Sequence, residues 1–290
     1  MSAPQQAHSG PSTPAPWRDL FLQHMATMPQ PTFTLATLHP VPASAAPAAG
    51  LAVVPRARTC IFRGTWGTLP DNKHNTAPRN APTYESDLPV FTTDARMDKT
   101  AEILDTAGTP AGAMVGMGPL TGGGGPVEAV FWPAEARTQW RVRGTAWVLG
   151  PDVEAEGGRA GREALMSRMR RVEGQDGEVE VEGQGQGQGK PWSWATEVTG
   201  HFGNLSPAMR GSFRNPPPGT PVAIPAAKGQ GLGQKVDHLH DELARSHFRV
   251  VVIVPTEVDQ ADLSDPENPK RWLYIYRARM GEWEKVAVWP

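Results

Sequence analysis

Apolar runs and alternating apolar and polar residues predict a series of short strands spread along this chain. The continuous apolar run Val250–Val254 predicts a strand that is buried on both faces. Shorter alternating segments, bounded by Gly, Pro and polar residues, complete a set of about eight strands. The predicted strands cover residues 32–38, 51–54 with 58–62 (broken by Pro55), 88–93, 127–132, 140–149, 248–254, 272–276 and 283–288.

Helical spacing of apolar residues is confined to short segments. Trp17, Phe21 and Met25 recur on one face of a helix that begins near Pro16, a residue suited to the first helical position. Further helices are predicted over residues 97–104, 159–171, 206–213 and 236–246. Asp94 is expected to cap the helix over 97–104. Strands and helices do not alternate regularly, so the predicted fold is mainly β with peripheral helices, arranged as a nearly closed antiparallel barrel.

Glycine and proline interrupt this pattern. The chain has 31 Gly and 30 Pro among 290 residues, and their clustering signals loops. We expect residues 1–16 to form a disordered tail and residues 17–290 to form a single domain. Flexible insertions are expected at residues 41–50, 105–126, 150–190 and 220–235. The Gly-Gln repeat at 183–189 has no side chains to bury.

Charge and cysteine content narrow the class of protein. The net charge is −2, without a basic stripe, which argues against a nucleic-acid partner. The single cysteine, Cys60, excludes an internal disulfide and a cysteine-based metal site, and its apolar strand predicts that it is buried. No stretch reaches the roughly 18 apolar residues that span a bilayer. We therefore expect a soluble, cytoplasmic protein without a membrane partner.

Two motifs suggest ligand binding only superficially. The glycines at 229, 231 and 233 lack the third-glycine spacing and the preceding strand of a dinucleotide fingerprint. His238 and His240 lie on different faces of the predicted helix, so a shared metal ion is not expected. Neither motif predicts a site.

Basic and amide residues occupy several predicted strand ends without a carboxylate pair or nucleophile triad beside them. Arg58 and Arg63 flank one strand, Lys99 lies near the start of a helix, and Gln139 shares a strand face with Arg141. An ordinary strand face exposed to solvent would also explain why Gln139 and Arg141 lie on the same side of their strand. Guanidinium groups suit phosphate, as does an ammonium near a helix N-terminus. Together they favour a site for an anionic cofactor that performs the chemistry itself.

Four segments, in order, resemble the pyridoxamine 5′-phosphate oxidase family. Residues 58–63 (RTCIFR) resemble its R-x-V-L-L-K flavin-binding strand, and residues 91–99 (FTTDARMDK) its next segment, an aromatic and Thr followed by Lys. Residues 137–144 (RTQWRVRG) are similar to its R-x-Q-x-R-x-x-G strand, and residues 271–290 to its R-x-x-Y-x-R…W…P terminus. Ser206, Arg210 and Phe213 with Pro218-Gly219 fit the FMN-binding branch rather than the true vitamin B6 oxidases.

The resemblance implies FMN as the cofactor and an FMN-binding split β-barrel. It also implies a homodimer with flavin at the subunit interface. It places Arg58, Lys99 and Arg96 near the phosphate. The residues that it places along the flavin or its ribityl chain are Arg63, Thr92, Thr93, Gln139 and Arg271. No catalytic side chain and no metal ligand is assigned.

Departures from the family pattern leave the reaction open. Asp98 precedes Lys99 where the oxidases carry a basic residue, and an acid beside a phosphate site is unfavourable. Residues 267–269 (ENP) replace the substrate-reading R-L-H of the oxidases. The leading interpretation is a flavin-dependent oxidoreductase of unidentified substrate. The alternatives are a non-catalytic FMN- or ligand-binding module and a β-rich interaction protein without a cofactor.

Overall fold

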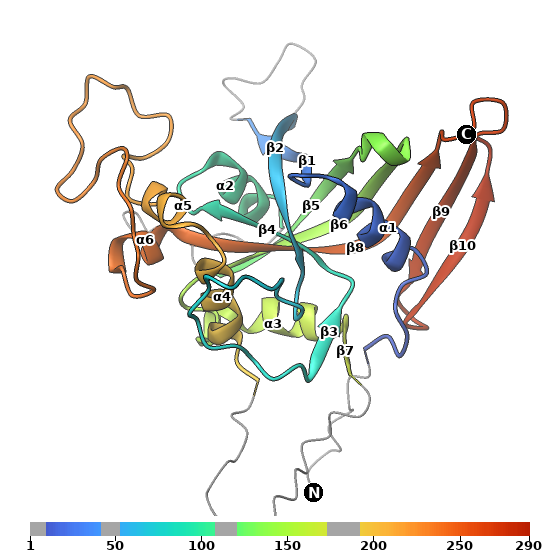
Figure 1. Ribbon diagram of the computed structural model, residues 1–290, viewed down its shortest axis with the longest axis horizontal. Helices are drawn as coiled ribbons and strands as arrows, with labels where there is room; N and C mark the ends of the chain where they lie inside the picture. Colours follow the sequence, from blue (N-terminus) through green and yellow to red (C-terminus); the bar gives the residue numbers. More distant parts are fainter. Residues whose placement is uncertain (1–9, 42–52, 108–120, 173–191) are drawn as a thin grey trace, which may run out of the picture.

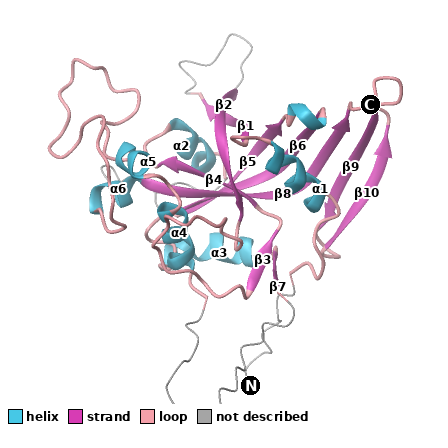
Figure 2. Ribbon diagram, viewed as in Figure 1, coloured by secondary structure: helices cyan, strands magenta, loops and turns pink. Residues whose placement is uncertain are grey.

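The computed structural model describes residues 10–41, 53–107, 121–172 and 192–290 (Figure 1, Figure 2). Within these residues, the main sheet has the strand order β10-β9-β8-β4-β2-β1-β5-β6. Because β8 also pairs with β6, the strands from β8 to β6 close into an antiparallel barrel. The predicted mainly β fold with peripheral helices is confirmed.

The strands of the main sheet are β1 (Thr32–Pro40), β2 (Val53–Thr65), β4 (Pro89–Asp94), β5 (Gly122–Phe131), β6 (Thr138–Leu149), β8 (Phe248–Asp262), β9 (Lys270–Arg277) and β10 (Glu282–Val288). A small second sheet pairs β3 (Tyr84–Ser86) with β7 (Met169–Arg171). The helices are α1 (Arg18–Thr27), α2 (Asp98–Asp105), α3 (Arg159–Met166), α4 (Trp194–Gly203), α5 (Pro207–Ser212) and α6 (Glu242–His247), with short 3₁₀ turns η2 (Ala134–Ala136) and η3 (Glu156–Gly158).

Strand β8 joins the barrel to a splayed C-terminal hairpin. Its first residues pair with β4, its second half pairs with β9, and β6 runs along its other side. In Figure 1 the hairpin β9–β10 therefore extends away from the barrel. The register shifts between Arg143 and Gly144, opposite the segment that contains Pro255. Because of this bulge, Pro255, which has no backbone N–H, fits inside a central strand. Strand β8 therefore continues past residue 254, where the predicted strand ends.

Two hydrophobic cores lie on opposite faces of β8. Val251 and Ile253 belong to the core inside the barrel, whereas Val250 and Val252 belong to a core that includes residues of α3 and α4. All four side chains are fully buried, so the predicted burial on both faces is confirmed. Phe21 of α1 packs edge-on against the aromatic rings of Phe62, Phe131 and Trp140. Helix α1 is therefore anchored to the barrel by the apolar face that the sequence predicted.

Several predicted helix boundaries differ from the structure. Asp94 does not cap α2, which begins at Asp98 after Met97; the Asp94 carboxylate instead accepts the Arg96 backbone N–H at 2.8 Å. Only Glu242–His247 is helical within 236–246, because Asp241 acts as the N-cap and accepts the Ala244 N–H. The helix predicted over 159–171 ends at Met166 and is followed by β7. Helix α4 was not predicted.

The predicted breaks and insertions also need correction. Strand β2 runs without interruption through Pro55, because β4 pairs with β2 only from Phe62 onward. Residues 122–126, which were predicted to belong to a flexible insertion, pair with β6. Residues 150–172, also predicted to be part of an insertion, contain α3 and β7. Residues 220–235 do form turns without helix or strand.

Part of the segment expected to be a disordered tail, residues 10–16, belongs to the described structure, whereas residues 1–9 lie outside the described residues. Ala15 is buried, and its backbone N–H donates to an Asp87 carboxylate oxygen at 2.8 Å. The remaining parts of the insertions, at 42–50, 108–120 and 173–190, lie outside the described residues. Cys60 is buried as predicted. In the described part of the chain, no helix has the length and apolar character needed to cross a membrane.

Candidate functional site

A cavity of about 650 Å³ lies between the β4–α2 turn and the loop that follows α5. Thr92, Thr93, Arg96 and Lys99, all predicted cofactor residues, line one side of it. The other side is largely apolar and is formed by residues 216–232, which include a run of three prolines. We call this space the Lys99 cavity. It combines a polar wall from β4 and α2 with an apolar wall from residues 216–232.

Lys99 is the cation of this cavity that is free to bind a ligand. Its Nζ donates to Thr93 Oγ1 at 3.2 Å, and no ion pair joins it to a carboxylate among the described residues. Burial lowers the pKa of Lys99, while the Cys60 thiol opposes this shift and the charge of Arg58 reinforces it. A half-buried ammonium without a counter-ion is stabilised by any anion that enters the cavity.

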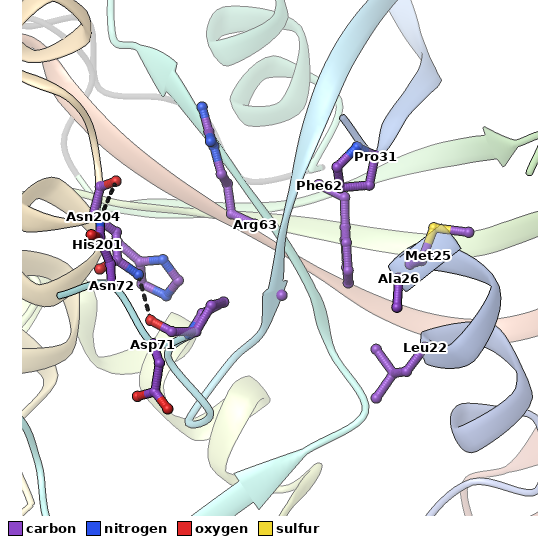
Figure 3. A pocket seen from close by; sticks show the side chains of 12 residues that line it. Leu22, Met25, Ala26, Pro31, Phe62, Arg63, Asp71, Asn72, His201 and Asn204 are labelled. Carbon is purple, nitrogen blue, oxygen red and sulfur yellow. Dashed lines mark hydrogen bonds between the residues drawn. The ribbon is translucent and has the colours of Figure 1, made fainter. Parts of the chain in front are cut away.

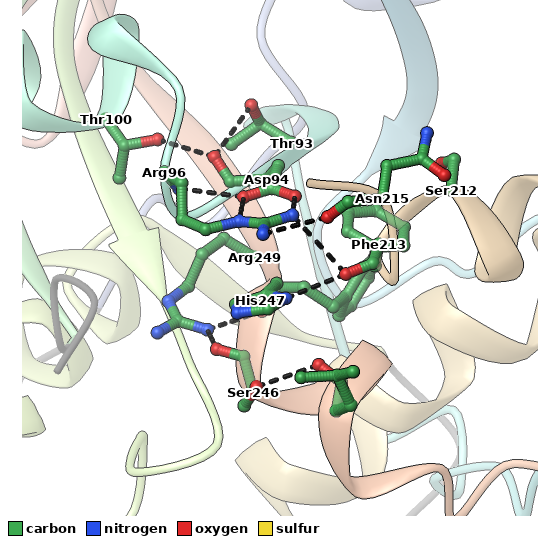
Figure 4. Close-up of polar contacts among 12 residues, drawn as sticks. Thr93, Asp94, Arg96, Thr100, Ser212, Phe213, Asn215, Ser246, His247 and Arg249 are labelled. Atoms are coloured by element: carbon green, nitrogen blue, oxygen red, sulfur yellow. Dashed lines mark hydrogen bonds and ion pairs between the residues drawn. The ribbon is translucent and has the colours of Figure 1, made fainter. Parts of the chain in front are cut away.

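Arg96 lines the same cavity but is already engaged. Its Nε and Nη2 donate to the two oxygens of Asp94 at 2.9 and 2.6 Å, and its Nη1 donates to the Asn215 carbonyl at 3.0 Å. Figure 4 shows this guanidinium between the end of β4 and the segment after α5. Nearby, His247 Nδ1 contacts the Phe213 carbonyl oxygen at 2.7 Å. Arg96 therefore holds the two walls of the Lys99 cavity together.

Arg58 lies close to Lys99 but is neutralised by a buried acid on α2. Its Nη2 donates to Glu102 Oε2 at 2.5 Å, and its Nη1 donates to Thr37 Oγ1 at 2.5 Å. His39 Nδ1 lies 3.2 Å from the other oxygen of Glu102, whose side chain is only 2% exposed. Burial raises the pKa of Glu102, but hydrogen bonds from Thr37 and Arg58 outweigh it and hold the pKa below its usual range. Arg58 thus contributes little net positive charge.

Arg63 faces a different cavity, of about 520 Å³, which it lines together with Asn72, His201 and Asn204. Figure 3 shows Arg63 on β2 and His201 on α4 among the side chains that line this cavity. His201 is completely buried, and burial, reinforced by the charge of Arg63, lowers its pKa to about 3. The imidazole is therefore neutral at physiological pH. Arg63 Nε is also buried without a hydrogen-bond partner in the described structure.

Gln139 and Arg271 lie near one another on the sheet and line neither of these cavities. In the strand register both are direct neighbours of Ala261 on β8. Arg271 donates to the two oxygens of Asp259 at 2.9 and 2.7 Å, and Arg141 also binds this carboxylate. Burial raises the pKa of Asp259, but the hydrogen bonds from the two arginines outweigh it and lower the pKa.

The structure thus brings together Thr92, Thr93, Arg96 and Lys99, with Arg58 beside them, and leaves the other predicted residues apart. The sequence reasoning missed the acids that engage the arginines, Asp94 and Glu102, and the apolar wall after α5. The triple proline was the available signal for that wall. Glu102 had no comparable signal, because it is 44 positions from Arg58 in the sequence.

Comparison with known proteins supports a cofactor site. Residues 14–150 match the family model described as pyridoxamine 5′-phosphate oxidase, FMN-binding domain. The chain is similar to the crystal structure of a pyridoxamine 5′-phosphate oxidase-related FMN-binding protein from Nostoc punctiforme PCC 73102, at 17% identity and a TM-score of 0.53, covering 96% of this chain and 100% of that chain. At this identity the likeness concerns the fold.

A second solved structure is less similar. PhzG from Burkholderia lata 383, in complex with tetrahydrophenazine-1-carboxylic acid, is 11% identical with a TM-score of 0.40, covering 97% of this chain and 100% of that chain. This likeness carries no argument about the present chain. No curated protein matches the present chain.

Proposed function

We propose that the chain, whose residues 14–150 match the family model described as pyridoxamine 5′-phosphate oxidase, FMN-binding domain, is an FMN-dependent oxidoreductase in which Lys99 binds the cofactor phosphate. The observation that carries this proposal is the Lys99 ammonium, which lines a cavity of about 650 Å³, donates to the Thr93 hydroxyl and makes no ion pair with the described residues. Its substrate and its electron donor are unidentified.

The residues of the Lys99 cavity fit the chemistry of FMN. The Lys99 ammonium suits the phosphate, and the hydroxyls of Thr92 and Thr93 suit polar groups beside it. The prolines at 216–218 and Leu232 offer an apolar surface to the flat ring. Bound FMN supplies hydride or electron transfer, so the site needs no acid or nucleophile from the protein. The protein's part is to fix Lys99 through Thr93 and to hold the apolar wall through Arg96.

The family resemblance adds four proposed FMN-binding residues, namely Arg58, Arg63, Gln139 and Arg271. A homodimer with flavin at the subunit interface is supported by exposed apolar side chains beside the Lys99 cavity. Val222 is fully exposed, Leu232 is 80% exposed and Ile224 is 56% exposed, as is typical of surfaces that another chain covers. A cytoplasmic location, which the single buried cysteine favours, completes the proposal.

A second candidate is a non-catalytic FMN-binding module. The observation that favours it is that Arg58 and Arg96 are both neutralised by carboxylates of the same chain. Fewer free cations leave a weaker hold on a phosphate. Two results would favour this candidate over an oxidoreductase. Neither NADH nor NADPH would reduce the bound flavin, and chemically reduced flavin would not return productively to its oxidised form.

The experiment is an absorbance spectrum of the purified protein after FMN is added and the excess is removed. We expect retained flavin bands near about 370 and 450 nm, with one FMN per chain. Anaerobic mixing with NADH or NADPH then tests turnover through loss of the longer-wavelength band. A folded protein that retains no flavin would contradict the proposal.

A further inference from the structure

The buried carboxylate of Glu102 belongs to the same helix as the cation of the proposed cofactor site. Lys99 and Glu102 are three positions apart in α2, so their side chains lie on one face of that helix. Glu102 is only 2% exposed, and its Oε2 accepts a hydrogen bond from Arg58 Nη2 at 2.5 Å. The carboxylate that holds Arg58 is therefore a direct neighbour of Lys99.

The charges of Arg58 and Lys99 act on the same surroundings. Burial raises the pKa of the Cys60 thiol, whereas the charges of Lys99 and Arg58 both lower it. Burial lowers the pKa of Lys99, the Cys60 thiol opposes this shift, and the charge of Arg58 reinforces it. Cys60 is two positions from Arg58 on β2. An anion that binds Lys99 is therefore also attracted by Arg58 when that charge is free.

The Arg58 guanidinium is held by a closed set of hydrogen bonds. Its Nη1 donates to Thr37 Oγ1 at 2.5 Å, and Thr37 Oγ1 donates to Glu102 Oε2 at 2.5 Å. The Arg58 side chain nevertheless remains 21% exposed, so part of it reaches solvent. Guanidinium groups bind carboxylates and phosphates in the same way. Glu102 therefore occupies Arg58 as a ligand phosphate would.

Two other cations near Glu102 are held less closely than Arg58. Arg56 Nε lies 4.0 Å from Glu102 Oε1, and its side chain is 46% exposed. His39 Nδ1 lies 3.2 Å from the same oxygen without forming a hydrogen bond. Arg58 is thus the cation that a change at Glu102 would release most directly.

We propose that Glu102 limits the affinity of the Lys99 cavity for the FMN phosphate by competing for Arg58. This inference rests on the proposed function. In the wild type the phosphate binds Lys99, while Arg58 stays with Glu102. Removing the charge of Glu102 makes Arg58 available as a second cation for the phosphate.

The test is a titration of the full flavin-free chain with FMN and with riboflavin, which lacks the phosphate. One added charge-assisted contact strengthens FMN binding in Glu102→Gln by about tenfold or more, and riboflavin binding stays within about threefold. Adding Arg58→Met to Glu102→Gln removes the gain. The matched control is Asp105→Asn, at an exposed acid of the same helix, which changes FMN affinity by about threefold or less.

A variant that leaves the buried pair intact keeps the test independent of folding. In Lys99→Met, FMN and riboflavin should bind within about threefold of each other, because Arg58 and Arg96 both remain paired with carboxylates. A preference for FMN of about tenfold or more in Lys99→Met would show that Arg58 already binds the phosphate, and would overturn the proposal.

Three results with the acid variants would also overturn it. These are an FMN affinity in Glu102→Gln that does not exceed that of the wild type, an equal gain in Asp105→Asn, and a gain that persists without Arg58. Failure of the proposed function looks different, since Lys99→Met would then bind FMN as tightly as the wild type.

Discussion

The buried carboxylate of Glu102 offers a quantitative test of how the candidate site is held. In Glu102→Gln the side chain keeps its shape and its contact with Thr37 but loses the charge opposite Arg58 and His39. Removing one partner of a buried ion pair costs about 3–5 kcal/mol. The Arg58 side chain is 21% exposed and can turn partly toward water, so we expect a loss of about 2–3 kcal/mol in the free energy of unfolding.

Urea denaturation of both proteins near neutral pH measures this loss. Asp98→Asn is the matched control, because Asp98 is 74% exposed and faces Arg56 at 3.5 Å. That variant should differ from the wild type by less than about 0.5 kcal/mol. The hydrogen bonds from Thr37 and Arg58 outweigh burial and hold the pKa of Glu102 below its ordinary value.

The stabilisation by Glu102 is therefore fully present above its pKa in the unfolded chain, about 4.3, and disappears as the pH falls through the lower folded pKa. The difference between wild type and Glu102→Gln should shrink over that acidic range. A Glu102→Gln protein as stable as the wild type at neutral pH would refute the reasoning. A difference that grows as the pH falls would contradict the sign of the pKa shift.

Two other residues give direct tests. Because burial lowers the pKa of His201 to about 3, ¹⁵N NMR should show no titration of this imidazole between about pH 5 and 8; a midpoint near about 6.5 would show that the ring is solvated. Asp259→Asn leaves Arg141 and Arg271 opposite a neutral amide, so urea denaturation should show a loss of about 2–4 kcal/mol; an unchanged free energy of unfolding would mean that the arginines are solvated instead.

The sequence predicted the barrel because its strands carry local signals. The run Val250–Val254 and the apolar face of α1 specify burial directly, and the structure confirms both. Helix α4 also carries a local signal, since Ser193 precedes it and the Ser193 hydroxyl accepts the Thr196 N–H at 3.1 Å. A side-chain N-cap of this kind marks a helix start in the sequence alone.

Other features depend on partners that are distant in the chain. The tolerance of Pro255 within β8 comes from a bulge in the pairing with β6, and that of Pro55 comes from the short pairing between β2 and β4. Local rules therefore ended both strands too early. The same limit applies to the site: the family resemblance placed Arg58, Arg96 and Lys99 near the phosphate, but only the fold shows that the Glu102 carboxylate pairs with Arg58.

The central claim is that Lys99 is the cation that binds the FMN phosphate, and an FMN titration of the flavin-free protein tests it most directly. Removing one charge-assisted contact costs about 1.5–3 kcal/mol, so Lys99→Met should weaken FMN binding by roughly tenfold to more than a hundredfold. Lys73→Met, at an exposed lysine outside the Lys99 cavity, should leave the affinity unchanged. Equal FMN affinity in Lys99→Met and wild type would contradict the account.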